Sequence, residues 1–327
     1  MVTPSPSDDA ALLEKPLRIG TRGSKLALWQ AEHVRDRLIE RWGEALTIEL
    51  VIISTKGDQI QDRPLYKIGG KGLFVNAIEE AIAEDRVDLA VHSMKDLPGS
   101  LAPGMILACT PPREDPRDTV LFRADLPPEQ RSLAALPSGS RIGTTSLRRS
   151  ALCRRLHPGA EILPLRGNVQ TRMARLEAGD FDAILLAAAG LRRLEILSDE
   201  MELLDPEVFC PAAGQGILAV ECRETDERVR RLLEPLGDPE TSIVAAAERA
   251  FLARLEGGCQ VPMGAYATLA DGELEIRGII GDPSGRPFFS GRKCGAPENA
   301  AALGRELAET LLGLGADRVL ERFVSRD

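Results

Sequence analysis

Residues 141–194 read RIGTTSLRRSALCRRLHPGAEILPLRGNVQTRMARLEAGDFDAILLAAAGLRRL, and this stretch decides the fold class. It holds three short apolar runs typical of buried strands: RIGTT (141–145), EILPL (161–165) and FDAILLA (181–187). Two segments with helical spacing lie between them: SLRRSALCRRL (146–156) and NVQTRMARLEAG (168–179). Strands that alternate with helices at this spacing predict βαβ units and a parallel sheet.

The same alternation precedes this stretch, so we expect another α/β unit there. We predict strands over 17–20, 47–54 and 88–93, and helices over 24–42 and 73–84. Ser24 is the expected cap of the first of these helices. Segment 57–72 is polar, rich in glycine and without a periodic pattern, which is typical of a functional loop.

The rest of the chain predicts a hinge between the two α/β units and a C-terminal domain of another fold class. The proline-rich, charged segment 111–118 predicts the hinge between the two units. The longest apolar run, AILLAAAGL (183–191), predicts a buried strand that runs into a turn, and GILAVEC (216–222) predicts a further strand. A small α+β domain is expected after about Thr241: a helix over 242–258, strands over 265–270, 273–280 and 286–293, and a helix over 298–315.

Composition excludes several classes of protein. The chain has 327 residues, enough for two or three domains of about 150 residues or fewer. A net charge of −9 argues against general nucleic-acid binding. No apolar run reaches the roughly 18 residues needed to span a membrane. The start of the chain has no signal-peptide pattern, so we expect a disordered tail over 1–14 and a cytoplasmic protein. The six cysteines form no CxxC pair and the three histidines have no zinc-site spacing, so reduced thiols and no metal are expected.

Arginines are concentrated in the stretch that decides the fold. Residues 141–193 hold 10 arginines and 4 acidic residues, a local charge of +6 that leaves −15 for the rest of the chain. Because a guanidinium binds carboxylate or phosphate through paired hydrogen bonds, this pattern indicates a small anionic ligand. The alternative for any single arginine is a solvated helix face in an arginine-rich protein.

Polar and basic residues follow the predicted strands at the edge of the sheet where ligands bind in open α/β folds. They are Arg22 and Ser24 after the first strand; Thr144, Thr145, Ser146, Arg148 and Arg149 at the end of 141–145 and just beyond it; Arg166 and Arg172 after 161–165; and Arg192 and Arg193 after 181–187. We interpret them as a cleft for a polyanion. Neither a Walker A nor a GxGxxG pattern accompanies them, so a nucleotide is not indicated.

Two further residues, Asp96 and Cys259, are candidates for a direct role in a reaction. Asp96 follows the strand at 88–93 beside Lys95, where it either forms an ordinary ion pair or acts as a general acid/base or cation stabiliser. Cys259 lies in the glycine-rich segment EGGCQVPMG (256–264), which favours covalent chemistry over buried packing.

Nine stretches, in this order, resemble the porphobilinogen deaminase family: TRGSKLALWQA, KIGGKGLF, AVHSMKDLP, REDPRD, GTTSLRR, LRGNVQTR, AAAGLRRL, PAAGQG and EGGCQVPMG. The resemblance implies an enzyme that joins four porphobilinogens head to tail into hydroxymethylbilane, with loss of ammonia at each step. The chain would grow on a dipyrromethane cofactor held by a thioether to Cys259. Two carboxylates on each pyrrole ring would account for the arginines.

The resemblance also assigns roles to residues. Asp96 would be catalytic, as the stabiliser of a cationic azafulvene. The cofactor would contact Ser24, Lys95, Asp96, Thr144, Thr145, Ser146, Arg148, Arg149 and Arg166. The substrate would contact Arg22, Arg149, Arg172, Arg193 and Gln215, together with Lys71 and Phe74 at the end of a loop that covers the cleft.

The family fold is α/β with three domains. The first two resemble type II periplasmic binding proteins with mainly parallel sheets, and the third is a small α+β domain that carries the cofactor cysteine. This implies domain 1 over 15–112 plus 213–235, domain 2 over 113–212 and domain 3 over 236–327. The partners implied are porphobilinogen and the growing oligopyrrole, with no nucleic acid, no membrane and a monomeric protein.

Two other functions fit parts of the pattern. A binding module of the same fold would use the arginines without needing Cys259 or Asp96. A thiol enzyme would use Cys259 as a plain nucleophile, although no histidine or asparagine motif lies near it.

Overall fold

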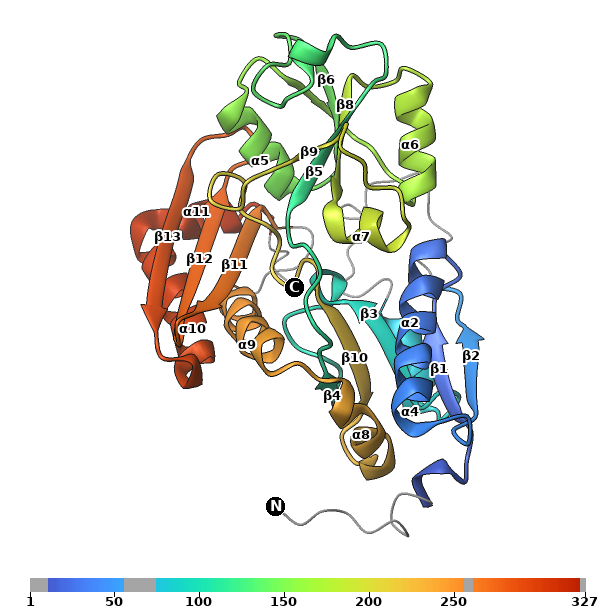
Figure 1. Cartoon of the computed structure of the whole chain (residues 1–327). Helices are drawn as coiled ribbons and strands as arrows, with labels where there is room; N and C mark the ends of the chain where they lie inside the picture. The colour runs from blue at the N-terminus through green and yellow to red at the C-terminus, as the bar shows by residue number, and fades with distance from the viewer. Residues whose placement is uncertain (1–10, 56–74, 256–260, 324–327) are drawn as a thin grey trace.

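The computed structural model describes residues 11–55, 75–255 and 261–323. Its strands form three separate sheets, two of five strands and one of three (Figure 1).

The first sheet has the strand order β2-β1-β3-β10-β4. Its strands are β1 (Leu17–Thr21), β2 (Ile48–Ile52), β3 (Leu89–Ser93), β4 (Met105–Cys109) and β10 (Leu218–Arg223). β10 is antiparallel to both of its neighbours, so the other four strands run in one direction. Helices α2 (Lys25–Trp42) and α8 (Glu227–Leu233) share one hydrophobic core with the sheet, and α4 (Asn76–Ala83) packs in another.

The second sheet repeats this plan with the order β7-β6-β8-β5-β9. Its strands are β5 (Asp118–Phe122), β6 (Arg141–Gly143), β7 (Glu161–Leu163), β8 (Ala183–Ala187) and β9 (Glu202–Leu203), and here β5 is the strand of opposite direction. The helices are α5 (Leu147–Leu156), α6 (Val169–Glu177) and α7 (Ala188–Arg193).

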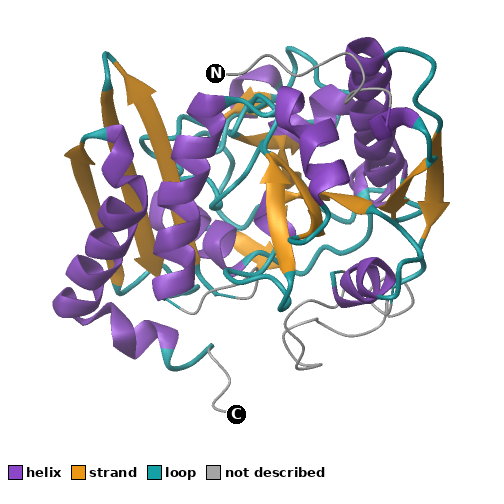
Figure 2. Cartoon of the chain, turned by 90° about the horizontal axis from the view of Figure 1, so that it is seen from below, coloured by secondary structure: helices purple, strands orange, loops and turns teal. Residues whose placement is uncertain are grey.

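The third sheet is an antiparallel meander of β11 (Met263–Ala270), β12 (Glu273–Gly281) and β13 (Phe288–Gly295). Helices α9 (Pro239–Arg254) and α10 (Ala300–Leu311) pack together against it, and α11 (Asp317–Leu320) follows (Figures 1 and 2). Gly304 allows the two long helices to approach closely, because a Cβ at this position would lie only 2.1 Å from the carbonyl oxygen of Ala247.

The chain crosses between the first two sheets twice, before β5 and before β10 (Figure 1). The two crossing segments are joined by a hydrogen bond from the backbone N–H of Glu114 to the carbonyl of Gly216, at 3.1 Å. Gly216 has a φ of +88°, and a Cβ there would lie 2.2 Å from the carbonyl oxygen of Glu114. A glycine is therefore required where the crossing segments meet.

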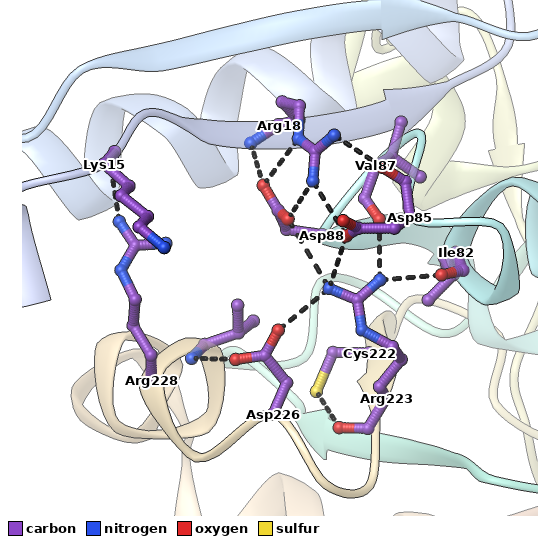
Figure 3. Close-up of polar contacts among 11 residues, drawn as sticks. Lys15, Arg18, Ile82, Asp85, Val87, Asp88, Cys222, Arg223, Asp226 and Arg228 are labelled. Carbon is purple, nitrogen blue, oxygen red and sulfur yellow. Dashed lines mark hydrogen bonds and ion pairs between the residues drawn. The ribbon is translucent and has the colours of Figure 1, made fainter.

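A charged network fixes the end of β10 in the first sheet, where Arg223 lies 3.5 Å from Asp88 (Figure 3). Arg18 of β1 donates to Asp88, just before β3, at 2.6 Å. Arg223 at the end of β10 donates to the carbonyl of Ile82 at 2.6 Å and to Asp226 at 2.9 Å. This network lies at the amino ends of β1 and β3, the opposite end of β3 from Asp96.

The structure confirms the predicted fold class, with mainly parallel sheets and a small α+β region at the end. The described parts of all predicted strands and helices form. The sequence did not predict β4, β5, β9, α8 or α11. Two predictions were wrong in detail: segment 111–118 ends in the first residue of β5, and the turn expected after β8 is the short helix α7.

The last residues of the expected disordered tail over 1–14 are also packed. Residues 11–13 form a helical turn, and Leu12 is 5% exposed in the core of the first sheet. The side chain of Arg228 on α8 donates to the carbonyl of Leu12 at 2.9 Å, which anchors this turn.

Candidate functional site

The carboxyl ends of β6, β7 and β8 lie side by side, because β6 is parallel to both of its neighbours. Each strand is followed by the start of a helix. Ser146 caps α5 by accepting a hydrogen bond from the backbone of Arg149, and Asn168 caps α6 in the same way. The predicted alignment of arginine-bearing turns along one edge is confirmed.

Arg148 and Arg149 on α5 are buried, and one carboxylate binds both. Arg148 donates to the two oxygens of Asp118 at 2.7 and 3.1 Å, and Nε of Arg149 donates to the same side chain at 2.8 Å. Burial alone would raise the pKa of Asp118, but the charges of Arg148 and Arg149 outweigh it and lower the pKa to about 2. Asp118 therefore stays ionised and neutralises one of the two guanidinium charges.

Lys95 and Asp96 lie in a single 3₁₀ turn, Met94–Asp96, directly after β3. The Asp96 side chain is exposed, and Nζ of Lys95 lies 3.4 Å from the amide oxygen of Gln215. Burial, helped by the charges of Arg149 and Arg148, lowers the pKa of Lys95 to about 8, although Asp96 opposes this. The hydrogen bonds of Gln215 with Lys95 and with the carbonyl of Pro116, just before β5, place the end of β3 next to the segment that enters the second sheet.

Arg166 and Arg172 extend the positive charge. Nε of Arg172 donates to the carbonyl of Gly167 at 2.8 Å. Burial and the neighbouring Arg149 and Arg166 lower the pKa of Arg172 to about 10, against the influence of Asp96. Nη1 of Arg166 is buried and makes no hydrogen bond to any residue that the structure describes. Because an unpaired buried donor costs about 1–3 kcal/mol, this nitrogen favours an anionic ligand that would supply the acceptor.

The hydroxyls next to these arginines partly serve the local fold. Oγ1 of Thr144 accepts from the backbone of Ser146 at 3.1 Å, and the exposed Thr145 donates to the carbonyl of Leu165 at 3.2 Å. Ser24 caps α2 by accepting from the backbone of Ala27 at 3.3 Å. The partly exposed Arg22 lies in the turn just before that cap.

Arg193 and Gln215 contact the segments that cross between the sheets. Arg193 donates to the carbonyl of Gly216 at 2.8 Å, and its guanidinium lies 5.7 Å from the ring centre of Trp29 on α2. Burial lowers its pKa to about 10. The Gln215 amide donates to the carbonyl of Pro116 at 2.7 Å. Both residues thus lie where the two sheets meet.

Cys259, Lys71 and Phe74 lie outside the described residues. The residues on either side of 256–260, Leu255 and Val261, belong to the same buried cluster as Met94 and Leu97, which flank Lys95 and Asp96. Further along, a Cβ on Gly264 would lie 3.0 Å from Cδ of Arg148.

Sequence reasoning missed Asp118 and Glu248. Asp118 was part of a quoted motif but was assigned to the hinge. The fully buried Glu248 accepts from Arg113 at 2.7 Å, from the backbone of Gly214 at 2.6 Å and from the backbone of Ala267 at 2.8 Å. The only signal for it was one acidic residue within an alanine-rich helical run.

The assembled site has a clear chemical character. This edge holds five cationic side chains: Lys95, Arg148, Arg149, Arg166 and Arg172. Arg148 and Arg149 bind the buried carboxylate of Asp118, whereas the carboxylate of Asp96, next to Lys95, is exposed. Within the described ranges, no group of three or more histidine, cysteine, aspartate or glutamate side chains is placed to hold a metal ion. None of the described helices is both long and apolar enough to cross a membrane. The arrangement suits a ligand with several carboxylates and a reacting centre that becomes positively charged.

The family models and the relatives that match this chain all belong to one protein family. The model "Porphobilinogen deaminase, dipyromethane cofactor binding domain" matches residues 17–231, and "Porphobilinogen deaminase, C-terminal domain" matches residues 243–313. Porphobilinogen deaminase of Syntrophotalea carbinolica is 52% identical over 304 residues, which cover 93% of this chain and 95% of the relative. That of Syntrophobacter fumaroxidans is 46% identical over 312 residues, which cover 95% and 99%.

Among solved structures, the similarities are more distant. A probable amino-acid ABC transporter extracellular-binding protein from Bacillus subtilis is 10% identical with a TM-score of 0.40, over 68% of this chain and 91% of that protein. An ancestral cationic amino acid solute binding protein is 15% identical with a TM-score of 0.41, over 70% and 93%.

Proposed function

Because the chain belongs to the porphobilinogen deaminase family, we propose that it joins four porphobilinogen molecules into hydroxymethylbilane. Each addition releases one ammonia. The chain grows on a dipyrromethane primer attached through a thioether to Cys259. The observation that carries this proposal is the group of arginines at the carboxyl edge of the second sheet, where the buried Nη1 of Arg166 has no hydrogen-bond partner among the described residues, since every pyrrole unit brings two carboxylates.

The residues fit a dipyrromethane group. The buried, unpaired Nη1 of Arg166 would find its acceptor in a carboxylate of the cofactor. Arg148 and Arg149 would hold the remaining carboxylates with N–H groups that are bound neither to Asp118 nor to the carbonyls of Cys210 and Leu185. Lys95, Asp96 and the hydroxyls of Ser24, Thr144, Thr145 and Ser146 complete the contacts. When bound, the group supplies the nucleophilic pyrrole carbon from which the product chain starts.

Asp96 carries the chemistry of each addition. The porphobilinogen aminomethyl group leaves as ammonia once it is protonated, and the electron pair of its carbon–nitrogen bond leaves with it. A cationic azafulvene remains, and the Asp96 carboxylate stabilises it electrostatically. After the new carbon–carbon bond forms, Asp96 accepts the proton displaced from the attacked pyrrole carbon, which restores the aromatic ring.

The incoming substrate is held by a second set of residues. Arg149, Arg172 and Arg22 bind its acetate and propionate groups through charge-assisted hydrogen bonds. Arg193 and Gln215 bind the substrate where the two sheets meet. Lys71 and Phe74, outside the described residues, are assigned to the same substrate by the family resemblance.

The proposal also includes the domain boundaries, the cellular location and the partners of the protein. Residues 15–112 with 213–235 form domain 1, residues 113–212 form domain 2 and residues 236–327 form domain 3. The partition is supported by the three sheets, each of which falls within one of these ranges. The enzyme works as a cytoplasmic monomer whose partners are porphobilinogen and the growing oligopyrrole.

The experiment that tests the function measures ammonia and linear tetrapyrrole from the purified protein supplied with porphobilinogen. The proposal predicts four ammonias for each tetrapyrrole. Cys259→Ser should remove the activity, whereas Cys294→Ser, at an exposed free thiol on β13, should retain it. Binding of porphobilinogen without ammonia release would instead indicate an anion-binding module.

A further inference from the structure

The turn that carries Asp96 is packed into the C-terminal region. Met94 and Leu97 on either side of Lys95 and Asp96 are each 1% exposed. Both belong to the buried cluster that contains Phe251 of α9, whereas the neighbouring strand residue Val91 belongs to the core of the first sheet. The position of the catalytic carboxylate therefore depends on contacts with α9.

Arg249 makes the polar part of that contact. Its Nη1 donates to the carbonyl of Pro98 at 3.3 Å and its Nη2 to the carbonyl of Gly99 at 3.0 Å. The backbone of the loop lies directly on the helix here, because a Cβ on Gly99 would lie 2.9 Å from Cα of Ala253. One arginine thus binds two successive carbonyls, two and three residues after Asp96.

The other end of this loop, at Ala102, is held by helix α4, which packs on the first sheet. Oε1 of Glu79 on α4 accepts from the backbone of Ala102 at 3.0 Å. Glu79 also faces Glu221 of β10, and burial together with Glu221 raises the pKa of Glu79, against the influence of the Ala102 hydrogen bond. The fully buried Glu221 lies 3.0 Å from Nε2 of His92, four residues before Asp96.

Burial lowers the pKa of Arg249, and the charge of Glu221 opposes this. The loop that leaves Asp96 is held by Arg249 at one end and by Glu79 at the other. Glu221 contacts His92 of strand β3, which leads into Asp96.

We propose that Arg249 is a positioning residue for the reaction: it fixes the Asp96 carboxylate by holding the loop 97–99 on α9. The inference rests on the proposed function. Arg249 binds carbonyls of the loop, so its effect on turnover passes through Asp96. Displacement of a catalytic group by about 1 Å can cost about 100-fold in rate, which makes such a contact measurable.

The test compares Arg249→Gln with Arg254→Gln in the full-length holoenzyme. Arg254 lies on the same helix but pairs with Glu309 on the surface. We expect Arg249→Gln to lower kcat for ammonia release by about 10- to 100-fold, with KM within about twofold and the cofactor mass retained. Arg254→Gln should match the wild type. Arg249→Lys, which keeps the charge but not the forked donors, should give an intermediate kcat.

A double-mutant cycle distinguishes positioning from a structural role. The activity of the Asp96→Asn variants is measured as single-turnover ammonia release over hours. In this background Arg249→Gln should have little further effect on the rate, because the carboxylate that Arg249 positions is already lost. An equal fold-loss in both backgrounds would overturn the proposal, as would an unchanged kcat in Arg249→Gln.

A second measurement is independent of activity. Amide hydrogen exchange at residues 97–102 should accelerate in Arg249→Gln, or in Arg249→Lys if the former does not fold, while exchange in the rest of β3 stays slow. Unchanged exchange would also overturn the proposal. If the wild-type holoenzyme releases no ammonia from porphobilinogen, the proposed function fails, and that result is separate from the outcome of the cycle.

Discussion

Asp118→Asn is the substitution whose effect can be worked out most fully from the structure. The side chain is fully buried and binds both Arg148 and Arg149, so the change removes the charge that balances two buried guanidiniums while it keeps the volume of the side chain. Removal of one partner from a buried ion pair typically costs about 3–5 kcal/mol.

The lowered pKa gives a second measure of the same interaction. The shift from 3.8 to about 2 corresponds to about 2–3 kcal/mol, at 1.36 kcal/mol for each pKa unit. The folded pKa is the lower one, so this stabilisation is complete above the unfolded value near 3.8 and disappears as the pH falls through about 2. We therefore expect Asp118→Asn to lose about 3 kcal/mol at neutral pH, and to approach the wild type in strong acid.

Urea unfolding of the two proteins at pH 7, 5, 4 and 3 would measure this difference. Asp125→Asn is the matched control, because that carboxylate pairs with Arg123 at the surface and should contribute at most about 1 kcal/mol. A loss below about 1 kcal/mol for Asp118→Asn at pH 7, or a difference that does not shrink between pH 5 and pH 3, would refute the reasoning.

Three further predictions concern the reaction. Asp96→Asn should keep the fold and the covalent cofactor but lose most turnover; wild-type rates would remove Asp96 from the mechanism. Arg172→Ala should lose a charge-assisted contact of about 1.5–3 kcal/mol, so that rapid-quench analysis shows elongation slowed or stalled; unaltered elongation would exclude Arg172 as a substrate contact. Lys95 loses its charge as the pH rises through about 8, so its contact with the cofactor should weaken and kcat should fall between pH 7 and 9; this fall should be absent in Lys95→Met.

The periodic parts of the fold were predictable because local spacing determines them. The strand ends at 143, 163 and 187 were aligned correctly from the alternation of strands and helices alone. β9 has only two residues, too few to show a period. β5 was missed because the prolines before it indicate a loop, whereas its pairing with β8 decides its structure and involves residues about 65 positions away.

The roles of the charged residues were less predictable, because burial depends on partners distant in sequence. Arg148 and Arg149 have the pattern of exposed anion-binding side chains, yet Asp118, 30 residues earlier, holds both inside the protein. Arg249 lies in an alanine-rich helix, and its two carbonyl partners are about 150 residues away. The candidate cysteine, in contrast, was indicated by sequence through its glycine-rich surroundings and the family resemblance.

The most direct test of the account is the intact mass of the denatured wild-type protein beside that of Cys259→Ser. The account predicts an excess mass in the wild type equal to two porphobilinogens less two ammonias, and the bare chain mass in Cys259→Ser. An equal excess in both proteins would contradict the attachment to Cys259. A bare wild-type chain that gains no mass after incubation with porphobilinogen would contradict the covalent primer itself.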